Sequence, residues 1–394
     1  MCDVPALRFP EFTGEWKEER LDEIAELSKG VGISKEQLSE DGEPCILYGE
    51  LYTKYKSEII HKVISKTNIE SSNLKHSKRN DVIIPCSGET AIDIAVARCV
   101  PFDNILLGGD LNIIRLHKDD GAFMAYQLNG KRKIDIAKLA QGVSVVHLYG
   151  DNIKAIKTYN PCLQEQQKIV KLLSMLDERM ELQNKIIEDL RLLRDAIMVE
   201  HYRKCNKSEL YIYDIGEPFN VMNLSKDDLT KDGSPCIIYG ELFTTYGCVI
   251  ENVVSHTTES PNSTLSTKGD LLFPASTTVD ALSLIAPSSI NEDGIILGGD
   301  MFGIHVNEQY NSNYLSYYFN IIGKKNLAKY AKGSTIIHLH YADIQKAKIT
   351  LPNKNEQETV ANLLLKVEHK LNIEQKMLIN YLNTKNFLLR QMFI

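Results

Sequence analysis

The stretch DGEPCILYGELYTKYKSEI begins at Asp41, and a near copy, DGSPCIIYGELFTTYGCVI, begins at Asp232. The copies start 191 positions apart, and the same spacing relates KLAQGVSVVHL from Lys138 to KYAKGSTIIHL from Lys329. The spacing slips by up to two positions between NDVIIPCS and GDLLFPAS, as loops allow. Solenoid repeats have periods of roughly 20–50 residues. A period this long therefore predicts a duplicated domain.

The composition is that of an ordinary globular protein. The chain has 394 residues, of which 43% are apolar and 25% charged, and no run reaches the ~18 consecutive apolar residues of a membrane span. The first residues, MCDVPALRFPEF, lack the basic and apolar regions of a signal peptide. None of the eight cysteines forms a C-x-x-C pair, which argues against a zinc site. We therefore expect a cytoplasmic protein with reduced thiols, no metal and no membrane attachment.

The charge of the chain weighs against a nucleic-acid partner. The net charge is −7, whereas phosphate binding depends on Lys and Arg. The distribution of charge matters more than its sum. Basic residues gather locally in the first half, at Lys54 and Lys56 for example, and no arginine occurs between Arg203 and Arg390. Each basic group taken alone also fits a solvated surface.

The last part of each copy differs from the part before it, because it contains no Gly or Pro after Pro161 or Pro352. Apolar residues recur there at steps of three and four, at Ile169, Leu173, Leu176, Met180, Ile187, Leu190 and Ile197. This spacing predicts a helix over 164–200 with a coiled-coil seam, about 55 Å long. The matched positions from Val360 to Leu388 keep the stripe and predict a second helix over 355–390. Because an apolar stripe must be buried, we expect the two helices to pair.

The sequence therefore predicts an α+β protein. Two duplicated, mixed α/β domains would be separated by two long antiparallel coiled-coil helices, with boundaries at residues 1–160, 161–204, 205–351 and 352–394. The short runs CILY, DVIIP, ILLGG, NIIRL and VSVVHL are typical of strands. A helical hairpin with two pendant domains and a purely structural role fits the same pattern.

Common catalytic motifs are missing from the sequence. There is no G-x-x-x-x-G-K-[ST], no H-E-x-x-H and no G-x-S-x-G. The Asn-Pro-Pro-aromatic and Asp-Pro-Pro-aromatic sequences of amino-methyltransferases are missing too. His147 and His338 hold matched positions in VVHL and IIHL, where a histidine more often belongs to the core than to a catalytic site. We therefore predict no catalytic residue.

Two polar loops in each copy are candidates for contact with DNA, because such side chains bond phosphates and base edges. Ordinary surface turns have the same composition. Glu50 and Glu241, just before the first loop of each copy, either orient backbone amides or accept from a cytosine amino group. The candidate contacts are Lys54, Tyr55, Lys56, Ser87, Gly88, Glu89 and Thr90 in the first copy, and Thr244, Thr245, Tyr246, Ser276, Thr277 and Thr278 in the second.

Taken in order, these pieces resemble the specificity subunit of a type I restriction–modification enzyme. The matching pieces are LRFPEFTGEW, YGELYTKY, NDVIIPCSGET, LGGDLNIIRL, AQGVSVVHLY and the Pro-x-x-x-Glu-Gln that opens the first long helix at Pro161. PNKNEQ, with Pro352, opens the second helix in the same way. The second half departs from the pattern in having no LRFP-like lead-in, and in having TTVD where the first half has GETA.

The resemblance implies a subunit that is not an enzyme and that directs the chemistry of others. Each domain would be a target recognition domain for one half of a split double-stranded DNA sequence, and the helices would fix the unread spacer. They would also dock two methyltransferase subunits, with S-adenosylmethionine, while restriction motor subunits supply ATP-driven cleavage. This chain would then bind no cofactor, and S-adenosylmethionine, ATP and Mg²⁺ are expected on its partners.

The same resemblance points to the starts of the two helices as partner contacts, at Glu165, Gln166, Glu356 and Gln357. An acidic residue there also suits the positive end of the helix dipole, so capping explains these positions equally well. Two alternative functions remain. One is a two-domain DNA-binding regulator, and the other is a cytosolic coiled-coil scaffold without methyltransferase partners.

Overall fold

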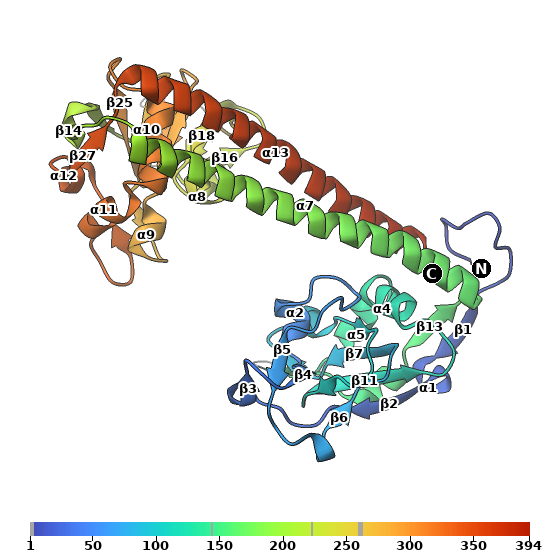
Figure 1. The fold of residues 1–394 in the computed structure, drawn as a ribbon. Coiled ribbons are helices and arrows are strands. Elements are labelled where there is room, and N and C mark those ends of the chain that lie inside the picture. The colour runs from blue at the N-terminus through green and yellow to red at the C-terminus, as the bar shows by residue number, and fades with distance from the viewer. Residues whose placement is uncertain (1–3, 143–144, 222–223, 259–262) are drawn as a thin grey trace. The chain divides into compact units, whose positions relative to one another are not determined.

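The computed structural model describes residues 4–142, 145–221, 224–258 and 263–394, and divides into two units (Figure 1). Unit 1 comprises residues 1–184 and 376–394, and unit 2 comprises residues 185–375. The division cuts both long helices, α7 (Leu163–Lys204) and α13 (Lys354–Gln391). Each unit therefore holds one mixed α/β domain together with a stretch of each helix.

The domain of unit 1 contains two larger sheets and two small ones. The four-stranded sheet runs in the order β2 (Ala25–Lys29), β11 (Leu111–Leu116), β7 (Asp81–Pro85), β9 (Arg98–Val100). The five-stranded sheet runs β3 (Leu38–Ser39), β5 (Ser65–Thr67), β4 (Glu43–Ile46), β10 (Leu106–Leu107), β6 (Lys75–His76). The two-stranded sheets are β1 (Lys17–Arg20) with β13 (Lys157–Asn160), and β8 (Ser87–Gly88) with β12 (Val146–His147). The helices are α1 (Leu21–Ile24), α2 (Glu50–Thr53), α3 (Ala91–Ile94), α4 (Gly121–Asn129), α5 (Lys133–Lys138) and α6 (Gly150–Lys154).

The domain of unit 2 repeats this arrangement, with β18 (Val249–Ile250) as a fifth strand in the sheet that has four strands in unit 1. This sheet runs β15 (Gly216–Asn220), β25 (Met301–Val306), β21 (Asp270–Pro274), β23 (Ser288–Ile290), β18. The other runs β16 (Leu229–Thr230), β19 (Ser255–Thr257), β17 (Ser234–Ile238), β24 (Ile296–Gly298), β20 (Thr264–Leu265). The small sheets are β14 (Ser208–Tyr211) with β27 (Lys348–Leu351), and β22 (Ser276–Thr277) with β26 (Ile337–His338). The helices are α8 (Glu241–Thr244), α9 (Ala281–Leu284), α10 (Ser312–Ile321), α11 (Lys324–Leu327) and α12 (Tyr341–Ile344). The predicted duplication and the α+β class are confirmed.

The central strands explain why the domain needs two apolar layers. Successive side chains of a strand point to opposite faces, and all of β7 is buried. Val82 and Ile84 pack on the side of α4, whereas Ile83 packs toward the five-stranded sheet. The predicted strand DVIIP is therefore confirmed as a strand buried on both faces. Of the predicted strand VSVVHL, residues 143 and 144 lie outside the described residues, and β12 covers Val146 and His147.

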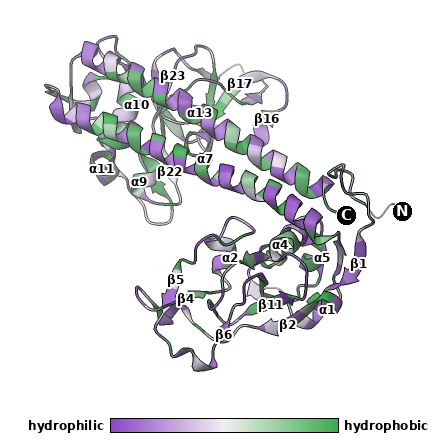
Figure 2. Ribbon diagram, turned by 45° about the vertical axis from the view of Figure 1, so that its right-hand side comes forward, coloured by the Kyte–Doolittle hydropathy of each residue, from purple (hydrophilic) through white to green (hydrophobic). Residues whose placement is uncertain are grey.

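In each unit a stretch of α7 lies beside a stretch of α13 and runs in the opposite direction (Figure 1). Figure 2 shows hydrophilic and hydrophobic residues alternating along both helices. The predicted antiparallel pair is confirmed, but its apolar stripe is not buried by the other helix alone. Ile169 and Leu173 also pack against Trp16 and Phe123 of their own domain. The other predicted seam residues range from buried Ile187 to half-buried Leu176, Met180, Leu190 and Ile197.

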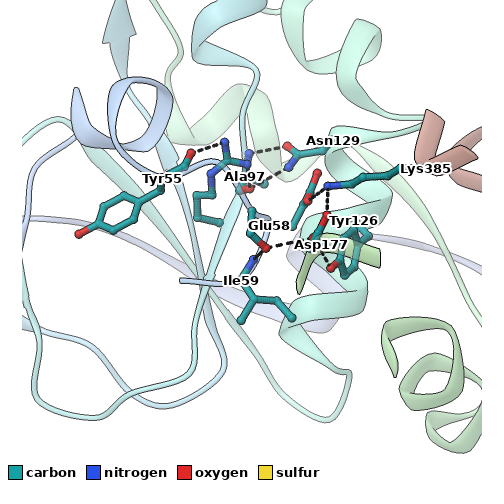
Figure 3. A network of polar contacts seen from close by, with 10 residues as sticks. Tyr55, Glu58, Ile59, Ala97, Tyr126, Asn129, Asp177 and Lys385 are labelled. Carbon is teal, nitrogen blue, oxygen red and sulfur yellow. Dashed lines mark hydrogen bonds and ion pairs between the residues drawn. The ribbon is translucent and has the colours of Figure 1, made fainter. Parts of the chain in front are cut away.

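A buried network of charges joins both helices to the domain of unit 1 (Figure 3). Lys385 of α13 lies with its ammonium 2.5 Å from a Glu58 carboxylate oxygen and 2.6 Å from one of Asp177 on α7. Tyr126 of α4 donates to Asp177 at 2.7 Å, and the Ser57 hydroxyl donates to it at 3.0 Å. These bonds satisfy charges that would otherwise be costly to bury.

The matched positions of unit 2 carry a smaller network. Arg194 of α7 takes the place of Lys385 and lies 3.3 Å from Glu368 of α13, which takes the place of Asp177. Cys248 occupies the position of Glu58. The Cys99 amide donates to the Glu58 carbonyl in unit 1, and the Ser289 amide donates to the Cys248 carbonyl in the same way in unit 2. The helix-to-helix ion pair is thus retained in both units, while the carboxylate on the domain side occurs only in unit 1.

Candidate nucleic-acid interface

The repeated YGEL sequence forms a turn held together by its own acid. In unit 1 the Glu50 carboxylate accepts from the Leu47 amide through Oε2 at 3.0 Å and from the Ser65 hydroxyl through Oε1. In unit 2 Glu241 accepts from the Ile238 amide at 3.1 Å and from the Ser255 hydroxyl. Both carboxylates are buried. Of the two predicted roles, the structure therefore shows the orientation of backbone amides.

The loop after YGEL in unit 1 exposes only part of what the sequence predicted. Lys54 and Lys56 are both exposed, and Lys54 also forms a 2.6 Å ion pair with Glu50 at the base of the loop. Tyr55 is buried, and its hydroxyl accepts from the Ile64 amide at 3.3 Å. Burial raises the pKa of Tyr55 to about 12. Tyr55 therefore belongs to the packing that holds the loop, and its contact with DNA stays a prediction.

The matched loop of unit 2 has no lysine. Thr244 and Thr245 are exposed, and the Thr244 hydroxyl donates to the Gly240 carbonyl at 3.1 Å. Tyr246 is half-buried, and its hydroxyl accepts from the Val254 amide at 3.2 Å, as Tyr55 does in unit 1. Burial raises the pKa of Tyr246 to about 12 as well. The two units therefore share the tyrosine that braces the loop and differ in the loop's charge.

The second candidate loop of unit 1 lies against the first. A Cβ added at Gly88 would meet the Ile94 side chain at 2.4 Å and the ring of Tyr52 at 4.0 Å, so that only glycine fits there. Partial burial and the nearby charges of Tyr48, Glu89 and Asp93 raise the pKa of Tyr52. Tyr52 of helix α2 therefore lies close to the loop 87–90.

The four residues of that loop divide between the interior and the surface. Ser87 is buried, with its hydroxyl 3.3 Å from an Asp110 carboxylate oxygen. Glu89 and Thr90 are exposed, and the Thr90 hydroxyl accepts from the Asp93 amide at 3.2 Å as the N-cap of α3. Glu89 and Thr90 remain candidates for contact with DNA, whereas Ser87 can act only through the backbone it holds.

The matched loop of unit 2 keeps this division. Ser276 is buried, Thr277 half-buried and Thr278 exposed. The Thr277 hydroxyl accepts from the Val279 amide at 3.2 Å. The N-cap changes from a threonine to Asp280, which accepts from the Ser283 amide at 2.7 Å. Both loops thus carry an acidic side chain at the candidate surface, Glu89 in unit 1 and Asp280 in unit 2.

Two histidines were wrongly predicted to belong to the core. His147 and His338 are both exposed, because Val146 and Leu148 take the inward positions of the alternation. His147 pairs with Ser87 across β12 and β8, and its ring stacks on Tyr149 with centroids 6.2 Å apart. The period of two in VVHL was the signal that could have placed them on the surface. Each histidine lies directly beside the second candidate loop of its own unit, His147 opposite Ser87 and His338 opposite Ser276.

The predicted partner residues at the helix starts are mostly used inside their own unit. Glu165 is buried and accepts from Arg8 through two bonds of 2.7 Å and from the Trp16 indole at 3.3 Å. Gln166 is buried and accepts from the Asp120 amide at 2.8 Å, at the start of α4. These two side chains dock the helix onto the domain, which leaves them no surface for a partner.

The second helix start is similar but more open. Gln357 is buried and accepts from the Asn311 amide at 2.9 Å, at the start of α10. Glu356 is half-buried and accepts from the Asn353 side chain at 2.9 Å. Of the four predicted residues, Glu356 is thus the one with surface to offer, and its contact with a partner stays a prediction.

Within the described ranges, no group of three or more His, Cys, Asp or Glu side chains is placed to hold a metal ion. Nor does any helix of those ranges combine the length and the apolar character needed to cross a bilayer. The cytoplasmic location stays a prediction.

Comparison with known proteins gives the family. A model of the type I restriction modification DNA specificity domain matches residues 13–192 and again residues 212–383. A Haemophilus influenzae protein described as a type I restriction enzyme specificity subunit is 32% identical over 132 residues, which span 33% of this chain and 32% of that protein. The type I restriction enzyme MjaVIII specificity subunit of Methanocaldococcus jannaschii is 23% identical over 407 residues, covering 95% of this chain and 90% of that subunit.

Solved structures share the fold. The type I restriction-modification system S subunit from M. genitalium superposes with a TM-score of 0.65 at 17% identity, over 99% of both chains. A chain from a study of complex assembly and conformational transition of the type I R-M system superposes with a TM-score of 0.54 at 15% identity, over 96% of this chain and 97% of that one. Since the family model covers well over half of the sequence, in two copies, this chain belongs to the family of type I restriction–modification DNA specificity subunits.

Proposed function

We propose that this specificity subunit reads a split DNA target, with each domain recognising one half. The observation that carries the proposal is the double match of the DNA specificity domain within one chain. The two copies share their framework but differ in their polar loops, where TKYK stands against TTYG and SGET against STTV. Because side chains in such loops choose the bases, the two half-sites are expected to be different words. The whole target is then not a perfect palindrome.

The same proposal assigns the chemistry to other subunits. Two methyltransferase subunits would bring S-adenosylmethionine and methylate one adenine in each half-site, on opposite strands. A restriction motor subunit would use ATP and Mg²⁺ for cleavage, so that this chain itself would bind no cofactor and catalyse no step. Exposed apolar residues along both helices support a docking role, since such patches often mark interfaces. They include Met175, Leu182 and Leu192 on α7, and Leu363, Ile379 and Phe387 on α13.

An exchange of domains tests the split target. Residues 20–158 are replaced by the matching domain of another specificity subunit, and the methylome of a host that also expresses the methyltransferase is sequenced. One half-site is expected to change while the other stays the same. The matched control replaces residues 211–349 and should change only the other half-site. A change of both halves by either exchange, or methylation of a perfect inverted repeat, would refute the independent reading of two halves.

The partners are tested with purified proteins. Light scattering of the complex is expected to give two methyltransferase subunits per chain, and a single one would contradict the proposal. Filter binding with and without the methyltransferase separates the alternatives. A regulator would bind its target equally well alone, and a protein scaffold would not bind DNA in either case.

A further inference from the structure

A polar cavity opens in unit 1 beside the candidate interface. Its volume is about 390 Å³, within the ~300–1,000 Å³ range of small-ligand sites. The cavity is bounded by the ends of β2 and β11 and by the start of α6, and His147 beside it pairs with Ser87 of the second candidate loop. The lining residues are Leu27, Ser28, Lys29, Asn112, Tyr149, Gly150, Asp151, Asn152 and Lys154.

Asn112 presents a buried acceptor to this cavity. Its side-chain amide group donates to the Leu148 carbonyl at 3.0 Å, which fixes the orientation of the side chain. The remaining carbonyl oxygen, Oδ1, is buried and has no hydrogen-bond partner among the described residues, and Asn112 as a whole is only 2% exposed. A buried acceptor without a donor costs about 1–3 kcal/mol. A ligand that brings a hydrogen-bond donor would remove that cost.

The residues around this acceptor supply further groups that a base could use. A Cβ at position 150 would lie only 3.2 Å from Asn112 Oδ1, so that Gly150 keeps the carbonyl uncrowded. Lys29 lies directly across the strand pair from Asn112, with its ammonium 6.0 Å from the ring centroid of Tyr149. Tyr149 is 49% exposed. The cavity therefore combines an acceptor, a cation and an open aromatic ring.

In unit 2 aromatic residues occupy the positions that match two residues of this cavity. The strand pair that matches Lys29 and Asn112 is Asn220 and Phe302, and the helix that matches α6 begins with Tyr341 in place of Gly150. The rings of Phe302 and Tyr341 meet edge to face with centroids 6.4 Å apart. A polar opening in one unit thus corresponds to packed aromatic rings in the other, on the same framework.

We infer that the cavity of unit 1 is a base-reading site for its half of the DNA target. This inference rests on the proposed function. Its ligand is a base edge that carries an exocyclic amino group, cytosine N4 or adenine N6, which donates to Asn112 Oδ1. Lys29 contacts the adjacent phosphate, and Tyr149 provides the apolar side of the site. Because Phe302 and Tyr341 occupy the matched positions of Asn112 and Gly150 in unit 2, the site contributes to only one half-site and makes the two words unlike.

The test uses the full chain in complex with its methyltransferase subunits. After the wild-type target is determined by selection from randomised duplexes, selection is repeated with Gly150→Tyr, which copies unit 2, and with Tyr149→Ala, which removes an exposed ring. Gly150→Tyr should weaken binding about tenfold or more and relax the preference for an amino-bearing base at one position of one half-site. His340→Ala, the matched change in unit 2, should leave that position unaffected.

A base analogue sharpens the result. Purine in place of adenine, or a pyrimidinone in place of cytosine, removes only the amino group at the affected position. The wild type should bind this duplex more weakly than the natural one. Gly150→Tyr should bind both duplexes with about the same, already reduced, affinity. Unchanged affinity and unchanged base preference for folded Gly150→Tyr would overturn the inference, with the cavity then holding only solvent. Where that variant does not fold, as judged by its melting curve, an unchanged Tyr149→Ala selection overturns it instead. A wild-type complex that selects no sequence at all would refute the proposed function itself.

Discussion

The helix pair is fastened to the two domains in different ways. In unit 1 Lys385 lies between Asp177 of the other helix and Glu58 of the domain, whereas in unit 2 the matched Arg194 meets Glu368 and finds Cys248 where Glu58 would be. Arg98, which shares the interior with Glu58, is likewise replaced, because the backbone match of Cys99 to Ser289 places Ser288 at its position. A positive and a negative charge were thus gained or lost together. The difference indicates that the framework tolerates a buried charge only when its partner is present.

Removal of the central cation should have the largest effect and should separate the two units. Lys385→Met leaves Glu58 and Asp177 buried without their common partner, which should lower the free energy of unfolding by about 3–5 kcal/mol. Arg194→Met removes the partner of Glu368, which is 12% exposed, and of Asp195, which is 46% exposed, and should cost about 2 kcal/mol. Urea unfolding followed by circular dichroism measures both.

A compensated variant is the control for this comparison. Lys385→Met combined with Glu58→Gln and Asp177→Asn removes the unpaired charges and should recover much of the lost stability, as expected of coupled sites. If Lys385→Met and Arg194→Met lower the free energy of unfolding equally, the additional carboxylate of unit 1, Glu58, does not contribute to the difference in stability.

The starts of the two helices give a second comparison. Glu165 of unit 1 is 1% exposed and held by Arg8, whereas Glu356 of unit 2 is half-buried and bonded to Asn353. Arg8→Ala should therefore destabilise the chain by about 2–3 kcal/mol, because it removes the partner of a buried charge. Asn353→Ala removes a helix cap and should cost about 1 kcal/mol. If urea unfolding shows a larger loss of stability for Asn353→Ala than for Arg8→Ala, the segment before β1 that carries Arg8 does not hold the first helix in place.

The features that could be predicted from the sequence are those that depend on residues close together in the chain or on a repeated segment. The duplication and both long helices were predictable for this reason. Helix α4 was not, because GAFMAYQLN is buried almost throughout and has no polar face to set a period. The charge network was not either, since Glu58 and Lys385 are 327 positions apart and a lysine in a helix usually marks a solvated face. The candidate loops stay predictions as contacts with DNA, and the inward turn of Tyr55 and Ser87 depends on packing that the sequence does not display.

The loops after YGEL allow a finer comparison in DNA binding. Both lysines of the first loop are exposed, but Lys54 also forms an ion pair with Glu50 at the base of the loop, whereas Lys56 is left for DNA. Lys56→Ala should weaken binding of all sequences alike and lower the slope of log K against log salt by about 1, as for the loss of one phosphate contact. Thr245→Ala in unit 2 is the control and should leave the salt slope unchanged. An unchanged slope for Lys56→Ala would remove this lysine from the interface.

The smallest expected effect concerns the independence of the two units, and buried thiols can report it. Cys99 of unit 1 and Cys248 of unit 2 are both buried, and burial raises the pKa of each thiol to about 12. At neutral pH an alkylating reagent should therefore modify them only when their unit opens, since the thiolate is the reactive form. Exposed Cys162 should be modified first and serves as the internal standard.

The two cation variants then act as selective probes of that opening. If the units open separately, Lys385→Met should speed the modification of Cys99 and leave Cys248 at its wild-type rate. Arg194→Met should do the opposite, although the thiol of Cys248 lies close to the substituted residue, so that part of its change will be local. Peptide mass spectrometry after timed alkylation gives both rates from one sample. Equal acceleration of both thiols by Lys385→Met would mean that the shared helices make the two units open as one, and that a charge gained in one unit stabilises the whole chain.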